Sequence, residues 1–172
     1  MAHFIETDPQ TLPENFIRRI REEWALAAAT AGGRTNAMTV SGGGIGCLWN
    51  QPVAFLLVRP QRYTYQFTEA AEGFSLSFFG PGRFRKELSY FGTVSGRDED
   101  KIAATGLTLL HHKGIPCFAE AETVLLCQKL YAQDLREDCA LSELVTSQYP
   151  EKDYHRMYVG RILTALRRED TL

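Results

Sequence analysis

The chain has 172 residues, with 19 Lys and Arg against 21 Asp and Glu, which gives a formal net charge of −2 at pH 7. Hydrophobic residues make up 44% and charged residues 23% of the chain, so we expect one globular domain over residues 1–172 with a sizeable core. The near-neutral balance argues against a protein that grips nucleic acid by neutralising phosphates, but it leaves a small anionic ligand open.

No apolar run approaches the roughly 18 residues that a membrane span needs. The first residues have neither the basic nor the apolar region of a signal peptide, so we expect a cytoplasmic protein with no membrane contact. The four cysteines contain no C-x-x-C pair, and buried, reduced thiols are therefore expected in place of a metal or redox site.

The first third of the chain predicts one helix and several strands. Apolar residues at helical spacing after a proline predict a short helix over residues 13–21. The alanine-rich stretch 24–31 has the propensity of a helix, although the following Gly32-Gly33 suits a strand entering a hairpin equally well. Two strands are expected on either side of the glycine-rich turn 41–44, and residues 52–58 form a continuous apolar strand.

The rest of the chain mixes helical spacing with alternation. In order, the pattern predicts a helix over residues 63–71, a strand over 74–79, helices over 83–91 and 99–105, a long bent strand over 117–131 and a closing strand over 154–166. Because hairpin-spaced strands outnumber regular βαβ units, an antiparallel barrel with helices in its connections is favoured over a doubly wound sheet.

Two segments carry cations at the predicted start of a helix. Arg59, Arg62 and Thr64 follow a strand directly, and unpaired helix N–H groups together with bidentate guanidinium groups suit a phosphate. Residues 93–101 again supply a hydroxyl, a glycine, an arginine and a lysine, which can hold an anion from a second side. The alternatives are solvated charges in the first segment and an ordinary capped helix in the second.

A third segment, residues 36–49, combines small residues with hydroxyls. Such a run lets a flat ligand approach the backbone, whose N–H and C=O groups can then pair with the ligand's polar edge. The run matches neither of the glycine-rich nucleotide-binding motifs. A glycine-rich hairpin without a ligand is the alternative.

Six segments in order carry a resemblance that spans about residues 14 to 166. They are Asn36–Thr39, Trp49-Asn50 before a proline-started strand, Val58–Thr64, Ser77–Phe79, Ser95–Lys101 and Asp153–Gly160. Together they resemble the flavin reductase-like family with an FMN-binding split barrel, especially its flavoredoxin-like branch. The R-P-x-R-Y-T and S-G-R-D-x-D-K segments are specific when they occur together.

The resemblance implies a mainly β (α+β) fold, a six-stranded antiparallel split β-barrel with helical insertions, in a homodimer that binds one FMN per subunit near the interface. It makes residues 24–31 the first barrel strand instead of a helix. At matching positions, it implies that the phosphate and ribityl chain are held by Arg59, Arg62, Tyr63, Thr64, Ser95, Gly96, Arg97 and Lys101. It also implies that the isoalloxazine ring is lined by Asn36, Met38, Thr39, Ser41 and Trp49.

One departure concerns the ring. Many relatives have an aromatic residue shortly after the Thr39–Ser41 stretch, whereas this chain has Gly42-Gly43-Gly44. One face of the ring is therefore expected to be more open here. No catalytic residue is assigned, because the cofactor carries the redox chemistry in a flavin enzyme.

Three functions follow from the resemblance. The first is an NAD(P)H-dependent reductase that passes hydride through FMN to free flavin or another acceptor. The second is an electron carrier whose bound FMN exchanges electrons with a redox protein, and the third is a flavin-binding module without turnover. His155 and Tyr158 either reach the flavin or pack at the dimer interface, and the spacing of His111, His112 and Cys117 fits no standard metal site.

Overall fold

A computed structural model describes residues 3–169 of the chain. Its strands are β1 (Phe4–Thr7), β2 (Ala25–Ala31), β3 (Arg34–Val40), β4 (Gly44–Leu48), β5 (Gln51–Val58), β6 (Gly73–Phe78), β7 (Leu109–His112), β8 (Ile115–Phe118), β9 (Thr123–Asp134) and β10 (Arg156–Arg168). Its α-helices are α1 (Phe16–Arg18), α2 (Thr64–Ala70), α3 (Arg85–Thr93), α4 (Lys101–Thr105) and α5 (Glu143–Thr146). Short 3₁₀ turns cover Pro9–Thr11 and Glu137–Cys139, and a π-helical turn covers Arg19–Glu23.

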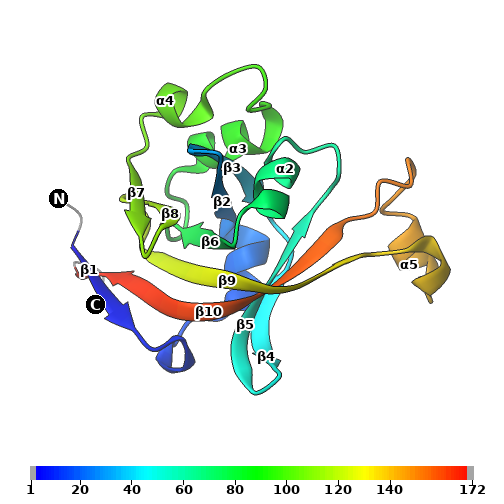
Figure 1. Ribbon diagram of the computed structural model, residues 1–172, viewed down its shortest axis with the longest axis horizontal. Helices are drawn as coiled ribbons and strands as arrows, with labels where there is room; N and C mark the ends of the chain where they lie inside the picture. Colours follow the sequence, from blue (N-terminus) through cyan, green and yellow to red (C-terminus); the bar gives the residue numbers. More distant parts are fainter. Residues whose placement is uncertain (1–2, 170–172) are drawn as a thin grey trace.

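Eight strands form one antiparallel sheet in the order β3-β2-β6-β9-β10-β5-β4, with β1 added beside β10, while β7 and β8 pair separately (Figure 1). This confirms the predicted class, a mainly antiparallel split barrel with helices in its connections. The predicted number of six strands is too low for the described residues. The six longer strands, β2, β3, β5, β6, β9 and β10, have six to thirteen residues, and the additional β1, β4, β7 and β8 have only four or five.

The glycine-rich segment connects two strands that do not pair with each other, so it is not the turn of a hairpin. β3 pairs with β2 and β4 pairs with β5, so Ser41–Gly43 joins two strands at opposite ends of the sheet order. Gly43 has a φ of +123°, and a Cβ at this position would collide with the carbonyl oxygen of Phe55. Only glycine allows this close approach of two backbones.

Residues 25–31 form strand β2, so the helix expected from propensity is wrong and the strand implied by the resemblance is confirmed. β2 lies between β3 and β6, and Ala25–Ala29 have no solvent-exposed surface. The helix preference of alanine over other ordinary residues is about 0.7 kcal/mol or less per residue. Burial on both faces of a central strand outweighs it.

The strand expected over residues 117–131 is broken in two. β8 ends at Phe118, and a turn closed by the Ala121 N–H on the Phe118 carbonyl (3.1 Å) moves the chain to the main sheet, where β9 begins at Thr123. The other strands predicted after residue 50, and the helices α2, α3 and α4, begin and end within two residues of their expected positions. The short helix expected over residues 13–21 is shared between α1 and the π-helical turn.

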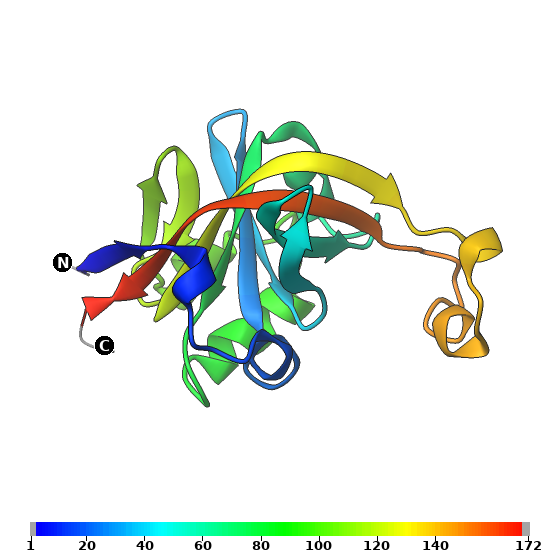
Figure 2. The same cartoon turned by 90° about the horizontal axis from the view of Figure 1, so that it is seen from below.

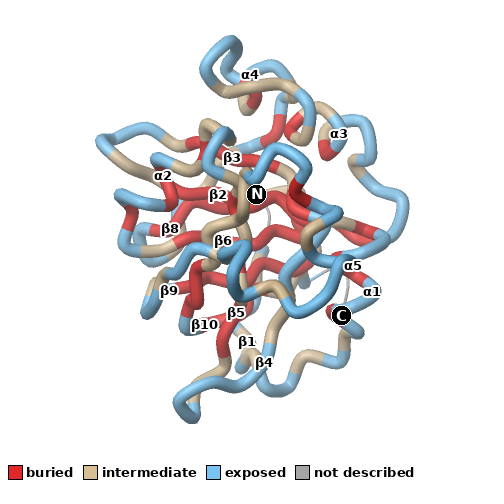
Figure 3. The backbone as a smooth tube through the Cα atoms, turned by 90° about the vertical axis from the view of Figure 1, so that its right-hand side faces the viewer, coloured by how far each residue is buried: buried red, intermediate tan, exposed pale blue. Residues whose placement is uncertain are grey.

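Two apolar clusters fill the interior. One lies inside the barrel and is built around Phe74, Phe78 and Tyr158, and the other lies between the sheet, α3 and the β7–β8 hairpin. Figure 3 shows the buried residues concentrated along the strands, with exposed residues in the outer connections. None of the helices within residues 3–169 is long and apolar enough to cross a membrane.

One segment of the chain, which we call the arm, projects from the barrel. β9 and β10 pair along most of their length, and the segment that joins them, residues 135–155 with α5, projects away from the rest of the molecule in both Figure 1 and Figure 2. Leu141 on this segment is 98% exposed and Leu144 is 74% exposed.

Candidate functional site

Two cations, the half-buried Arg62 and the buried Lys101, meet at the end of helix α3. Arg62 donates from Nη1 to the Gly92 carbonyl (2.7 Å) and from Nη2 to the Phe91 carbonyl (3.1 Å), and the Lys101 ammonium donates to the same Phe91 carbonyl (3.2 Å). These carbonyls belong to the last turn of α3, the negative end of the helix dipole, which favours cations. Neither cation forms an ion pair with a carboxylate within residues 3–169.

This arrangement is electrostatically incomplete. Lys101 is 4% exposed, and burial together with the nearby Arg62 lowers the pKa of its ammonium to about 8. Burial also lowers the pKa of the Arg62 guanidinium. Buried charges in proteins are normally paired with an opposite charge, so two adjacent cations held only by carbonyls mark a place where an anion would be stabilised.

A small cavity of about 80 Å³ opens beside these cations; we call it the anion cavity. It is lined by residues 61–64, residues 93–96 and Lys101. Asn36 donates from Nδ2 to the hydroxyl of Thr64, one of these lining residues (2.9 Å). A Cβ on Gly96 would overlap the Asn36 side-chain oxygen and lie 2.9 Å from the Tyr63 ring, so the loop approaches this closely only because residue 96 is glycine.

On one side the anion cavity adjoins a larger cleft of about 360 Å³, the glycine cleft, with which it shares Arg62. The glycine cleft is lined by Met38, Thr39, Val40, Ser41, Gly42, Gly43, Leu57, Arg59, Arg62, Tyr149 and His155. One wall is the end of β3, an edge strand of the sheet, whose outer backbone groups have no partner strand among the described strands. The cleft therefore combines apolar and polar side chains with the edge of a strand that has no further partner strand among the described strands.

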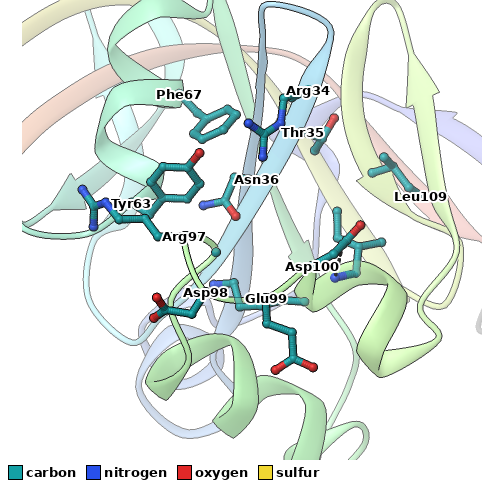
Figure 4. A pocket seen from close by; sticks show the side chains of 13 residues that line it. Arg34, Thr35, Asn36, Tyr63, Phe67, Arg97, Asp98, Glu99, Asp100 and Leu109 are labelled. Atoms are coloured by element: carbon teal, nitrogen blue, oxygen red, sulfur yellow. Dashed lines mark hydrogen bonds between the residues drawn. The ribbon is translucent and has the colours of Figure 1, made fainter.

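On the other side lies a third cleft of about 420 Å³, the arginine cleft, which shares Tyr63, Gly96 and Lys101 with the anion cavity. Its lining comprises residues 34–36, Tyr63, Phe67, residues 96–102 and Leu109 (Figure 4). The three hollows are thus neighbours, because the anion cavity shares lining residues with both clefts, and we call them together the groove.

The structure gathers most of the predicted site residues in this groove. The anion cavity brings together Arg62, Tyr63, Thr64, Ser95, Gly96 and Lys101; the glycine cleft holds Met38, Thr39, Ser41 and Arg59; the arginine cleft holds Asn36 and Arg97. Within this group, Thr39 donates its hydroxyl to the Leu88 carbonyl and Ser95 accepts from the Arg97 N–H.

Arg59, predicted at the phosphate, lies outside the anion cavity, and Trp49, predicted at the ring, lies outside all three hollows. Arg59 is engaged by the Asp153 carboxylate (2.5 Å) and the Gln148 carbonyl (2.9 Å), and hydrogen bonds from Arg59 and Gln61 lower the pKa of Asp153. Trp49 is 55% exposed at the β4–β5 turn and lines none of the three hollows.

The base of the arm contributes two residues, of which the sequence singled out only His155. Tyr149 and His155 both line the glycine cleft, joined by a 2.7 Å hydrogen bond between the phenol oxygen and Nδ1. Burial and the nearby Arg59 lower the pKa of His155, so the neutral imidazole is favoured. Tyr158, by contrast, is fully buried in the barrel and bonded to Glu69 (2.7 Å).

Known structures share this fold. A flavoredoxin from Methanosarcina acetivorans matches with a TM-score of 0.69 at 20% identity, covering 99% of this chain and 78% of that one. An FMN-binding protein from Thermus thermophilus, with bound p-hydroxybenzaldehyde, matches with a TM-score of 0.68 at 22% identity, covering 98% and 83%. An NADH:FAD oxidoreductase from Streptomyces globisporus, in complex with NAD and FAD fragments, matches with a TM-score of 0.62 at 17% identity, covering 88% and 80%.

The sequence itself supplies the assignment. No curated protein matches the chain. The family model described as the flavin reductase like domain matches residues 17–172, which is most of the sequence. The chain therefore belongs to the flavin reductase like domain family.

Proposed function

We propose that the protein binds FMN along the groove, with the phosphate in the anion cavity and the isoalloxazine ring in the glycine cleft. The observation that carries the proposal is the pair of the half-buried Arg62 and the buried Lys101, which lacks a carboxylate within residues 3–169 and borders a cavity with room for a small anion. A dianionic phosphate there would receive charge-assisted hydrogen bonds from both side chains.

The proposed roles follow the positions of the residues. Arg62 and Lys101 neutralise the phosphate, while Thr64 and Ser95 supply hydroxyls beside it. Arg59 lies between Asp153 and the glycine cleft, so its proposed contribution is to hold the cleft wall as well as to add positive charge. Arg97 lines the arginine cleft, on the other side of the anion cavity from the glycine cleft, so we propose that it adds positive charge at the phosphate end of FMN.

The proposed ring contacts are Met38, Thr39 and Ser41, which line the glycine cleft, whereas Asn36 lines the arginine cleft. The glycines at 42 and 43 leave that wall without side chains, which gives a second planar molecule room to approach the ring. Trp49 lies outside the groove of its own chain, and we keep it as a ring contact only across a subunit interface.

FMN, when bound, would supply the redox chemistry, namely hydride uptake from a donor and transfer of the electrons to an acceptor. The protein holds the cofactor and leaves one face accessible. We propose that the protein is a reductase that uses NAD(P)H as donor and free flavin or another small molecule as acceptor. The family supports this function, and so does the structural likeness to an NADH:FAD oxidoreductase.

The second candidate is an electron carrier that keeps FMN bound and takes electrons from a redox protein. The likeness to flavoredoxins from two organisms favours it. A homodimer is part of both proposals, because the arm exposes leucines that a second subunit would cover. A cytoplasmic location remains a prediction from the sequence.

An absorbance spectrum of the purified protein tests the proposal and separates the two candidates. The visible flavin bands are recorded before and after anaerobic addition of NADH and of NADPH. Bleaching by either nucleotide supports the reductase. Bands that persist until dithionite is added support the carrier, and a protein that stays colourless and ignores added FMN overturns the proposal.

A further inference from the structure

We propose that Tyr149, at the base of the arm, is the aromatic residue that contacts the isoalloxazine ring in the glycine cleft. The contact would come from the arm and not from the glycine-rich segment, whose side of the cleft stays open. This inference rests on the proposed binding of FMN, because it concerns the ring end of the same site. It makes the arm one of the segments that determine how the ring is held.

The glycine-rich segment offers no side chain for a flat ring to pack against. Gly42 and Gly43 both line the glycine cleft, and nothing lies within 4 Å of a Cβ position built on Gly42. The aliphatic side chains of the lining are Met38, Val40 and Leu57. Among the described residues that line this cleft, Tyr149 is the one with a six-membered aromatic ring, the kind of side chain that packs best against another aromatic plane.

The Tyr149 ring is already fixed in place without a ligand. The Tyr154 ring stacks on it, with centroids 4.3 Å apart and 24° between the planes, and the Arg59 guanidinium lies 5.0 Å from its centroid. Its hydroxyl shares the 2.7 Å hydrogen bond with Nδ1 of His155, and the whole residue is only 8% exposed. Such a preorganised side chain loses little further freedom when a ligand arrives, so its contact would contribute to affinity.

Arg59 ties this part of the arm to the end of strand β5. Its guanidinium donates to the Gln148 carbonyl (2.9 Å) and to the Asp153 carboxylate (2.5 Å), and the Gln61 side chain donates to the same carboxylate. Gln148 directly precedes Tyr149, and Asp153 follows it four residues later. The backbone on both sides of Tyr149 is therefore anchored beside the glycine cleft, although the outer part of the arm projects away from the barrel (Figure 2).

The stacked partner of Tyr149 provides a matched control. Tyr154 is half-buried on the same arm and lines none of the three hollows, whereas Tyr149 lines the glycine cleft. If Tyr149 served only to pack the arm, the two tyrosines would be equivalent, because each packs against the other. If Tyr149 contacts the flavin ring, a change at residue 149 alone alters the bound flavin.

The test measures the fluorescence lifetime of protein-bound FMN and riboflavin, together with their dissociation constants by calorimetry. A phenol in contact with an excited isoalloxazine ring quenches its fluorescence by donating an electron, and the phenyl ring of phenylalanine does not. Tyr149→Phe therefore keeps the shape of the side chain and removes the quencher, Tyr149→Ala removes the contact, and Tyr154→Phe is the control.

We expect Tyr149→Phe to lengthen the lifetime of the bound flavin several-fold and Tyr154→Phe to leave it unchanged. Tyr149→Ala should weaken FMN and riboflavin equally, each by up to about tenfold, because the lost contact is to the ring and not to the phosphate. Since Tyr149→Ala also removes packing within the arm, the lifetime in Tyr149→Phe decides. Bound flavin whose lifetime is unchanged in Tyr149→Phe, or is lengthened as much in Tyr154→Phe, overturns the ring contact alone. An unsubstituted protein that binds neither flavin overturns the proposed function as well.

Discussion

Lys101 is the side chain whose position is hardest to account for without a bound anion. Its ammonium donates to one helix carbonyl and lies beside Arg62, and its pKa is lowered to about 8. Because the unfolded chain holds this proton more firmly than the folded one, the Lys101 charge opposes folding below pH 8, and this cost is relieved as the pH rises above 8. A phosphate in the anion cavity would reverse this preference and favour the protonated form.

FMN affinity should therefore depend on pH through Lys101. Between pH values of about 7 and 9 the phosphate stays dianionic, and affinity should fall above pH 8 by up to about tenfold per unit as Lys101 loses its proton. Calorimetric titrations at several pH values measure this slope, and the Lys101→Arg variant should flatten it. Riboflavin, which has no phosphate, serves as the control and should show no slope; an equally flat FMN curve for the unsubstituted protein would contradict the assignment.

A substitution at Gly96 tests whether the shape of the anion cavity, and not only its charge, determines FMN affinity. An added Cβ would overlap the buried Asn36 side chain, so Gly96→Ala should push the 95–97 loop outward, weaken FMN binding by about tenfold and cost about 1 kcal/mol of unfolding free energy. Gly44→Ala is the matched control, because nothing lies within 4 Å of its Cβ position. Unchanged FMN affinity in Gly96→Ala would show that the loop does not shape the cavity.

Residue types and spacing were enough to predict which cations gather at the groove, but not their partners. Arg62 and Lys101 lie in the two motif segments, and the structure brings them to the same helix carbonyl. The pairing of Arg59 with Asp153 spans 94 positions and depends on where the arm returns to the barrel, which no local pattern encodes. Tyr149 was missed for the same reason.

At the scale of elements, tertiary packing decides the cases where local preference failed. The alanines of β2 favour a helix locally, yet they form a central strand because β3 and β6 pair with them on either side. The glycines at 42–44 suggest a tight hairpin, yet they carry the chain between the two end strands of the sheet. Amphipathic helices such as α2 and α3 were predicted well, because the spacing of their apolar residues alone indicates which face is buried.

A charged contact joins strand β1 to the β7–β8 hairpin. Glu6 accepts hydrogen bonds from Lys113 and His112, both at 2.8 Å, and these bonds, with Lys113 first, lower the pKa of Glu6 to about 2. A carboxylate with a lowered pKa stabilises the fold above its ordinary pKa, near 4.5, and this contribution is lost as the pH falls towards 2.

Glu6→Gln should therefore loosen the β1–hairpin contact at neutral pH without affecting flavin binding, because Glu6 lines none of the three hollows. Faster amide hydrogen exchange in β1 and at residues 112–115 is the expected result. Glu151→Gln, at an exposed glutamate without an ion-pair partner within residues 3–169, should leave exchange unchanged. Identical exchange in both variants would show that the contact contributes nothing measurable.

At the scale of the whole molecule, the arm is the feature that a single subunit leaves unexplained. Within residues 3–169 its leucines 141 and 144 remain exposed, while the base of the arm supplies Tyr149 and His155 to the glycine cleft. A dimer that forms through the arm would therefore also stabilise the proposed flavin site. The expectation of one domain over residues 1–172 remains a prediction.

The double variant Leu141→Glu and Leu144→Glu should convert the proposed dimer to a monomer, because the charges would be buried in the interface without partners. Light scattering coupled to size-exclusion chromatography measures the mass. Ile17→Glu, at an equally exposed apolar residue on α1 that is 81% accessible, is the control and should retain the mass of the dimer. A monomeric unsubstituted protein would rule out the dimer.

The most direct test of the central claim, that Arg62 and Lys101 hold the FMN phosphate, compares the dissociation constants of FMN and riboflavin for the unsubstituted protein and for Lys101→Met. Two charge-assisted contacts predict that FMN binds at least about 100-fold more tightly than riboflavin, and that the substitution reduces this ratio by about tenfold while leaving riboflavin affinity unchanged. Equal affinities for the two flavins, or a ratio that Lys101→Met does not alter, would contradict the claim.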